Sequence, residues 1–361
     1  LVGILIFFVS FFFLWQNEKN YVEELNVNKF ILKNAKHIDS TSLNQENNNS
    51  LIYFTGIIQS NEDLEDEYKV KAENSLFLYR KVEIYQWLEK ENIKKTKKPN
   101  GETVEEIFYT YHKDWVEGLV DSSNFVEKNH INPTNQTIYS KKLYSQNIKV
   151  GNYKIKQSQI NLMRNKKIEI LDNEDYSINF KDLNVKKHNS IYYISNNPSS
   201  PNIGDVRISY FYIPSNFDIT IIGKQINNSI TEYLINSPEL TKEHSFFYFS
   251  NGSQTIETVI KILNSEINMK TWLMRGIFTF LMFIGLVLIF SPLHFLSSFI
   301  PILGGIFSGI TTLISFFIAL ILSTATILIA YFRFRPILIL YLVLIIIIFL
   351  AIKNKKEIKL K

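Results

Sequence analysis

The six histidines are the residues whose chemistry could most readily serve catalysis or metal binding. They are His37, His112, His130, His188, His244 and His294. No two stand at the spacing of metal ligands. The chain has no HExxH segment, no glycine-rich phosphate loop and no GxSxG sequence. It also has no cysteine, which excludes disulfides, iron–sulfur clusters, thiol catalysis and thiolate zinc sites. We therefore expect no catalytic, metal-binding or cofactor-binding residues, and a protein that is not an enzyme.

Two further sets of ionisable side chains could each have a function or could simply be solvated. His294 lies in the uncharged stretch 276–332, and an ionisable group at membrane depth is a candidate proton relay. Because it follows Pro292 by two residues, it fits the membrane–water interface as well. Five carboxylates crowd into residues 62–67, without the glycine that a calcium-binding loop needs for its turn. We interpret that acidic patch as a solvated loop.

The residues best suited to binding lie in two predicted strands. Tyr85 and Trp87 point to one face of a strand and Gln86 to the other. The two aromatic rings could belong to the core or could form an exposed recognition face, and both interpretations stay open. Asp205 and Arg207 share one face of a second strand, where we expect a local ion pair.

Small residues near the C-terminus suit the association of helices. Gly304, Gly305 and Gly309 would allow two helices to approach closely, and Gly305 and Gly309 stand at small-xxx-small spacing. The apolar segments otherwise offer Ser and Thr, which bond to neighbouring helices, rather than the ionisable groups typical of a transport path. We therefore expect self-association into a homo-oligomer.

The charge distribution divides the chain into two environments. The 361 residues carry 39 Lys+Arg and 34 Asp+Glu, a formal net charge of +5, yet residues 276–332 and 336–352 contain none of these. The first run far exceeds the roughly 20 residues that cross a bilayer. The large segment 16–271 is slightly acidic, which disfavours nucleic acid as a partner.

We expect four membrane spans around one large domain. The first is an N-terminal anchor truncated at its start, and an apolar segment broken by Gly and Pro, either a loop or re-entrant, follows the second. In chain order the expected parts are the anchor 1–15, the domain 16–271, a span at 272–290, the broken segment 291–308, spans at 309–332 and 336–352, and a basic tail at 353–361.

The tail sets the expected orientation. Four spans place both chain ends on one side, and the lysines of 353–361 assign that side to the cytoplasm under the positive-inside rule. The large domain would then be extracytoplasmic or luminal. Arg333 and Arg335 would lie on the outer side, which weighs against this orientation, but the tail lysines outnumber them.

The large domain has the pattern of short strands separated by turns. Ser75–Glu89 and Glu106–Trp115 alternate and are joined by a loop with a Pro-Asn-Gly turn, which predicts an antiparallel pair. Residues 254–267 have helical periodicity and would run on toward the second span. The predicted fold class is a multi-pass α-helical membrane protein with a large β-rich (α+β) extracytoplasmic domain that is sandwich-like or barrel-like.

The segment YRKVEIYQW at residues 79–87 resembles the signature of the transmembrane protein 43 family, also called LUMA. The order of one span, a large domain and three further spans is similar as well. Further similar residues are YTYHKDW at 109–115, SSNF at 122–125, Asn132-Pro133, IGDVRI at 203–208, Arg275, Gly285-Leu286, Pro292-Leu293, Pro301, Leu303-Gly304 and Arg335-Pro336.

The resemblance implies an integral membrane protein without enzymatic activity. Animal members resemble organisers of the endoplasmic reticulum and inner nuclear membranes that self-associate and are linked to lamins and emerin. In a bacterium, the resemblance implies the cytoplasmic membrane with a periplasmic domain, and lamins and emerin drop out.

The sequence thus favours a non-enzymatic membrane scaffold, whose expected partners are membrane lipids, further copies of itself and an unidentified protein, with no nucleic acid and no cofactor. The alternative is a lipid- or solute-handling protein built on the broken segment 293–308. Its polar candidates are His294, Ser297, Ser298 and Ser308.

Overall fold

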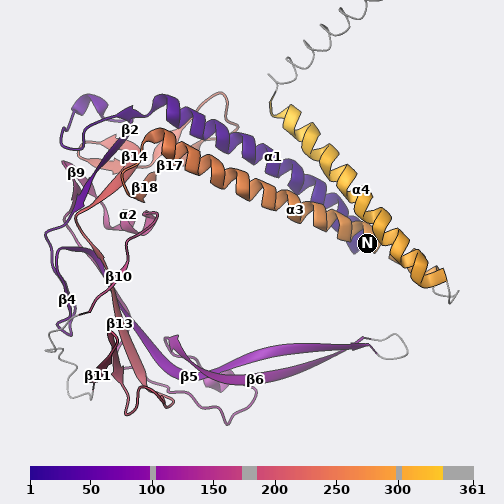
Figure 1. Cartoon of the computed structure of the whole chain (residues 1–361), viewed down its shortest axis with the longest axis horizontal. Coiled ribbons are helices and arrows are strands. Elements are labelled where there is room, and N and C mark those ends of the chain that lie inside the picture. The colour runs from indigo at the N-terminus through magenta and orange to yellow at the C-terminus, as the bar shows by residue number, and fades with distance from the viewer. Residues whose placement is uncertain (98–102, 173–184, 298–302, 336–361) are drawn as a thin grey trace, which may run out of the picture. The chain divides into compact units, whose positions relative to one another are not determined.

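The computed structural model describes residues 1–97, 103–172, 185–297 and 303–335. The chain forms two compact units (Figure 1). A helical unit comprises Leu1–Ala35, Leu234–Phe246 and the chain from Thr255 onward. A β-rich unit comprises Lys36–Tyr233 and Phe247–Gln254. The expected span 336–352 and tail 353–361 lie outside the described residues.

Three long helices make up most of the helical unit. They are α1 (Val2–Asn34), α3 (Ile256–Ser297) and α4 (Leu303–Arg333). In the described part of the chain, these three are long and apolar enough to cross a membrane. Two short strands, β16 (Tyr233–Ile235) and β17 (His244–Phe246), pair with each other in a separate sheet.

Helix α1 continues well beyond the expected anchor 1–15. It ends at Asn34, so the assignment of residues 16–34 to the β-rich domain is wrong. The buried side chains of α1 recur at helical spacing, including Leu14, Glu18, Val27 and Ile31, because α1 packs along α3. Polar residues stand on this packed face, so hydrophobic periodicity alone does not show the second half of the helix.

For the segment 291–308, the interpretation as a loop is wrong where the structure describes it, and the re-entrant alternative stays a prediction. Helix α3 passes through Pro292 to Ser297, and α4 begins at Leu303, so both ends of the segment are helical. Gly and Pro disfavour helices in water, but a backbone in lipid must satisfy its hydrogen bonds internally and therefore stays helical. The expected helix 254–267 begins at Ile256 and is continuous with the second span, as predicted.

Within the helical unit, α1 and α3 approach each other closely at two glycines. A Cβ added to Gly285 would lie 2.8 Å from the backbone nitrogen of Phe7, and one added to Gly3 would lie 2.7 Å from Cβ of Leu288. Such distances leave no room for a side chain. Gly3 and Gly285 therefore allow α1 and α3 to pack closely.

One sheet of the β-rich unit closes on itself. Strand β2 pairs with β8, β8 with β9, β9 with β15 and β15 with β14, and β14 returns to β2. This ring agrees with the barrel-like prediction. The strands of the sheet are β1 (Lys36–His37), β2 (Leu51–Gln59), β8 (Ile148–Val150), β9 (Tyr153–Ile155), β14 (Phe217–Ile226), β15 (Ser229–Thr231) and β18 (Tyr248–Asn251).

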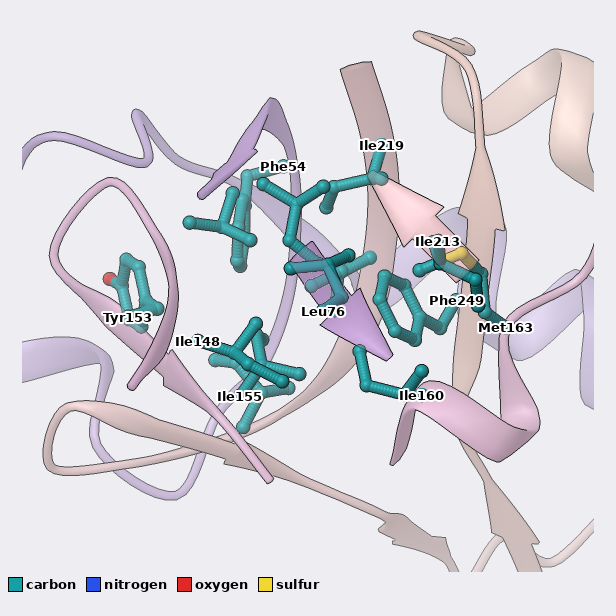
Figure 2. Packing of buried hydrophobic residues seen from close by; sticks show 14 of the residues in the cluster. Phe54, Leu76, Ile148, Tyr153, Ile155, Ile160, Met163, Ile213, Ile219 and Phe249 are labelled. Atoms are coloured by element: carbon teal, nitrogen blue, oxygen red, sulfur yellow. The ribbon is translucent and has the colours of Figure 1, made fainter. Parts of the chain in front are cut away.

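A hydrophobic core fills this ring. Figure 2 shows Phe54, Tyr153 and Phe249 among aliphatic side chains from several strands, with Ile160 contributed by the short helix α2 (Gln157–Leu162). The rings of Phe54 and Tyr153 stack at 4.9 Å between centroids. Because alternate residues of each strand point inward, the aromatic and β-branched composition of these strands produces one continuous core.

The second sheet carries a long hairpin. Its main strand order is β11–β12–β13–β5–β6, with β10 on β13 and β7 on β5. Strands β5 (Ser75–Lys97) and β6 (Thr103–Glu117) confirm the predicted antiparallel pair and extend it. The other members are β7 (Lys141–Tyr144), β10 (Glu169–Ile170), β11 (Val185–His188), β12 (Ile191–Ile194) and β13 (Val206–Pro214), and β3 (Leu64–Glu65) pairs separately with β4 (Lys71–Ala72).

Candidate interaction site

The motif at residues 79–87 lies on β5, where its even-numbered residues are buried. Gln86 is completely buried, and its amide donates to the carbonyl of Gly118 at 2.6 Å and accepts from the amide of Val120 at 2.9 Å. Tyr85 and Trp87 point to the opposite face and are half-buried. The interpretation of these two rings as core residues is therefore wrong, and Gln86 is the residue of the three that holds the fold.

The half-buried rings belong to an aromatic face of the β5–β6 hairpin. Residues directly opposite each other in the register share a face, so Tyr85 lies beside Trp115 with ring centroids 5.3 Å apart. Trp87 meets His130 edge-on at 4.4 Å, and the Lys113 ammonium lies 4.7 Å from the centre of its ring. We define the aromatic face as Tyr85, Trp87, Tyr109, Tyr111 and Trp115.

The predicted local pair between Asp205 and Arg207 does not form. Arg207 Nε donates to Glu83 Oε2 at 2.8 Å, because Glu83 stands directly opposite it in the β13–β5 register. Asp205 precedes β13 and accepts instead from the Ser195 hydroxyl at 2.6 Å. Burial opposes ionisation of Glu83, but hydrogen bonds from Arg207 and Lys81 outweigh it and lower its pKa.

The acidic patch is not a simple solvated loop. Asp66 and Arg80 are both buried, and Arg80 Nη1 donates to Asp66 Oδ2 at 2.6 Å. Arg80 Nη2 donates to Glu67 at 2.6 Å, and the Tyr210 hydroxyl donates to Asp66 Oδ2 at 2.8 Å. A buried charge is costly unless it is paired, so the buried carboxylate Asp66 needs these partners. We call Asp66, Glu67, Arg80 and Tyr210 the Arg80 cluster.

Ionisation in the Arg80 cluster follows from these contacts. The hydrogen bond from Arg80 lowers the pKa of Glu67 from its ordinary value of 4.5 to about 2. Burial, and then the neighbouring Asp66 carboxylate, raises the pKa of Tyr210. The phenol therefore stays protonated and can donate to Asp66. Sequence reasoning missed Arg80 and Tyr210, for which a buried strand position on an otherwise apolar parity was the available signal.

A second charged cluster lies in the helical unit. Glu18 of α1 is completely buried and receives two hydrogen bonds from Arg275 of α3, each 2.7 Å long. The Arg275 guanidinium lies 4.6 Å from the ring centre of Trp272, and it lies 5.9 Å from that of Tyr21. The Arg335 guanidinium lies 5.2 Å from the same Tyr21 ring. We call these residues the Arg275 cluster. Sequence reasoning missed Glu18.

Polar contacts continue between α1 and α3 beyond the Arg275 cluster. The Tyr21 hydroxyl donates to the Asn268 side chain at 2.6 Å, and the Asn28 amide donates to Asn264 at 2.8 Å. Lys270 pairs with Glu24 at 3.3 Å. The helix pair is therefore apolar on one side of the Arg275 cluster and polar on the other.

The three candidate glycines lie in α4, which begins at Leu303. A Cβ added to Gly309 would meet nothing within 4 Å, so this backbone is open to another helix. The surroundings of Gly304 and Gly305 lie outside the described residues. The expectation that these glycines mediate assembly stays a prediction.

Within the described ranges, no three His, Asp or Glu side chains are grouped so that they could hold a metal ion. The described part of the chain instead presents the aromatic face, the two charged clusters and the open helix backbone at Gly309. Their chemistry is that of binding through stacking, ion pairing and apolar contact.

Three apolar helices joined to a large β-rich domain define the chain as an integral membrane protein. Residues 84–336 match the family model described as Transmembrane protein 43, which is well over half of the chain. The chain therefore belongs to the transmembrane protein 43 family, as the motif at 79–87 predicted.

Curated relatives match along most of the chain. It is 25% identical over 348 residues to Transmembrane protein 43 of Rattus norvegicus, covering 93% of this chain and 84% of the relative. Transmembrane protein 43 of Homo sapiens is 24% identical with the same coverage. The Transmembrane protein 43 homolog of Drosophila melanogaster is 24% identical over 257 residues, covering 70% and 65%. No solved structure matches the chain.

Proposed function

We propose that the protein is a non-enzymatic organiser of a membrane. In this proposal the helices are a multi-pass anchor, the β-rich unit is extracytoplasmic, and the β5–β6 hairpin binds a partner protein. The compartment follows from the host, as the cytoplasmic membrane of a bacterium or the endoplasmic reticulum and inner nuclear membranes of a eukaryote. The hairpin is the observation that carries the proposal.

Most of the hairpin stands apart from the rest of the second sheet. The β13–β5 register ends at Ile84, and beyond it, in the described part of the chain, β5 pairs with β6 alone as far as Lys97. A ribbon of two strands is at best marginally stable by itself in water, and both of its outer edges offer unpaired backbone groups. Such an element gains stability when a partner covers it.

Apolar side chains near the far end of this ribbon face solvent. Ile93 and Ile107 stand directly opposite each other and are 52% and 54% exposed. Phe108 and Val104 are exposed as well, on the opposite face of the ribbon, because they stand opposite Asn92 and Thr96 in the register. Exposed apolar residues gathered on a folded domain are typical of a protein-binding surface. The aromatic face lies on the same face as Ile93 and Ile107, toward the base of the hairpin.

The helices support anchoring and self-association. The Arg275 cluster combines Trp272, Tyr21 and arginine side chains at one level of the helices, as in the aromatic belt at a membrane–water interface. The polar α1–α3 contacts beyond it suit an aqueous environment. The open backbone at Gly309 allows a helix of a second copy to approach.

Photocrosslinking of the full chain in its native membrane tests the proposal. A photoreactive residue at Ile107 should give one recurrent protein adduct, and one at Gly309 should give a covalent dimer of the chain. The same residue at the exposed Glu46 is the matched control and should give neither product. Lipid adducts alone at Gly309, with no recurrent adduct at Ile107, would contradict the scaffold.

Lipid or solute handling by the segment 293–308 stays a prediction. Its candidate side chains, His294, Ser297, Ser298 and Ser308, lie outside the described side chains.

A further inference from the structure

A groove of about 360 Å³ runs between α3 and α4 of the helical unit. Its size is at the lower end of the range of small-molecule pockets. Trp272, Arg275 and Gly276 line it from α3, and Phe316 is among the residues that line it from α4. Both helices are apolar enough to cross a membrane, so the occupant of this groove comes from the bilayer.

The groove is polar at one end and apolar along its length. At the apolar end, Phe283 of α3 and Phe316 of α4 meet edge to face with ring centroids 5.9 Å apart. At the other end lie Trp272 and the Arg275 guanidinium, opposite Ile327 of α4. A molecule with a charged head and a hydrocarbon chain matches this distribution.

Beside the polar end, the Arg275 cluster holds two guanidinium groups and one carboxylate. Glu18 neutralises Arg275 through two hydrogen bonds. Arg335 does not line the groove, but its guanidinium lies 5.2 Å from the ring centre of Tyr21, which the Arg275 guanidinium approaches to 5.9 Å, and 4.0 Å from that of Tyr331. Within the described residues, no carboxylate lies within ion-pairing distance of Arg335, and its Nη1 is buried without a hydrogen-bond partner.

A buried guanidinium nitrogen without an acceptor is costly, so the protein gains if an external anion supplies that acceptor. Arginine matches the oxygens of a phosphate through paired N–H donors. Basic sites between membrane helices at the level of the headgroups are the places where anionic lipids bind. A single lipid would therefore satisfy both features: its phosphate would supply the missing acceptor, and its acyl chain would fill the apolar groove.

We propose that this groove is a binding site for one anionic glycerophospholipid. Its phosphate lies against Arg335 and Arg275 beside Trp272, and one acyl chain follows the groove toward Phe283 and Phe316. The site is separate from the hairpin and from Gly309, and it does not depend on the proposed scaffold function.

Native mass spectrometry of the full chain, released from detergent micelles, tests the site with two probe lipids. Phosphatidylglycerol is the anionic probe and phosphatidylcholine is the zwitterionic one. The unmodified protein should retain one phosphatidylglycerol per chain and bind phosphatidylcholine more weakly. Arg335→Gln should weaken phosphatidylglycerol binding about fivefold, as expected for the loss of one cation beside an anionic headgroup.

Glycine substitutions provide a matched pair. A Cβ at Gly276 or at Gly309 would meet nothing within 4 Å, so a larger side chain at either position should leave the fold intact. Gly276 lines the groove and Gly309 does not. Gly276→Leu should therefore abolish retention of phosphatidylglycerol, while Gly309→Leu should leave it unchanged.

Three outcomes would overturn the site. They are equal retention of the two probe lipids by the unmodified protein, undiminished retention by Gly276→Leu, and absence of any retained phosphatidylglycerol. The thermal unfolding midpoint of each variant in detergent shows that a loss of lipid is not a loss of fold.

Discussion

Each of the two units pairs an arginine with a buried carboxylate, but the two units complete the surroundings of these charges to different degrees. In the β-rich unit, Arg80 is held by Asp66 and Glu67, and its Nε donates to the carbonyl of Tyr139 at 3.0 Å. In the helical unit, Glu18 and Arg275 satisfy each other, while Nη1 of the neighbouring Arg335 has no acceptor among the described residues.

The difference indicates different roles for the two clusters. A charged network in which each guanidinium nitrogen has an acceptor fixes the packing of strands and leaves no nitrogen for a ligand. The Arg275 cluster has one cation in excess, and this leaves an N–H donor to which a ligand can bind. We therefore assign the Arg80 cluster to the fold and the Arg275 cluster to the membrane boundary.

The largest expected effect is a loss of stability when the Arg80 cluster is disrupted. Asp66→Asn leaves the Arg80 charge buried with a weaker partner, so the β-rich unit should lose about 3–5 kcal/mol of stability. Hydrogen exchange of the β5 and β13 amides measures this loss as a lower free energy of local opening. The neighbouring Glu65 makes an exposed ion pair with Lys69, so Glu65→Gln should cost no more than about 1 kcal/mol. Equal costs for the two variants would show that the Arg80 cluster does not stabilise the fold.

In the Arg275 cluster, substitution of Arg275 and substitution of Arg335 should change stability by different amounts. Arg275→Gln leaves the completely buried Glu18 without its cation and should destabilise the α1–α3 pair by about 3 kcal/mol. Arg335→Gln removes a guanidinium nitrogen that is buried without an acceptor, so it should not lower the stability in lipid-free detergent. The thermal unfolding midpoints of the two variants decide between these expectations. A comparable loss in both would mean that Arg335 is part of the structural network.

Gly285 lies in a packed helix interface, whereas Gly309 faces open space, and substitutions at the two positions can be compared. Gly285→Leu should destabilise the helical unit by about 1–3 kcal/mol, because the new side chain meets the backbone of Phe7. Gly309→Leu should leave the midpoint unchanged while reducing the fraction of dimer seen by native mass spectrometry. The assignment fails if Gly285→Leu unfolds at the same temperature as the unmodified protein.

The smallest expected effect is a dependence on pH within the Arg80 cluster. The pKa of Glu67 falls from 4.5 to about 2 on folding, so its stabilising contribution is complete above pH 4.5 and disappears as the pH falls toward 2. Because the Glu67 side chain is 45% exposed, the contribution should stay below about 1 kcal/mol. The stability difference between the unmodified chain and Glu67→Gln, followed by hydrogen exchange, should shrink across this interval. A difference that stays constant down to pH 2 would contradict the shift.

Local patterns were sufficient for several features of the fold. The uncharged stretch 276–332 identified membrane helices, and alternation over Ser75–Glu89 and Glu106–Trp115 identified the hairpin, because both signals depend on neighbours in sequence. The motif at 79–87 identified the family. The end of α1 could not be predicted, since Glu18 interrupts the apolar stripe and its partner lies 257 residues away.

The candidate site divides in the same way. Residue types and parity showed that Tyr85 and Trp87 share a face opposite Gln86, but strand parity alone does not say which face is buried. The register of β13 on β5 gave Arg207 to Glu83 rather than to Asp205. The packing of α1 on α3 gave close approach to Gly3 and Gly285, while a Cβ at Gly276 or Gly309 would meet nothing within 4 Å.

The sequence by itself therefore determined that this chain has apolar helices for a membrane, a strand-rich domain and a hairpin. Hydrophobicity and periodicity are properties of short segments, and they act before distant parts of the chain meet. Only the tertiary structure decided which charges are neutralised and which guanidinium nitrogen has no acceptor among the described residues. Those outcomes depend on pairs such as Glu18 with Arg275 and Asp66 with Arg80, which register and helix packing bring together.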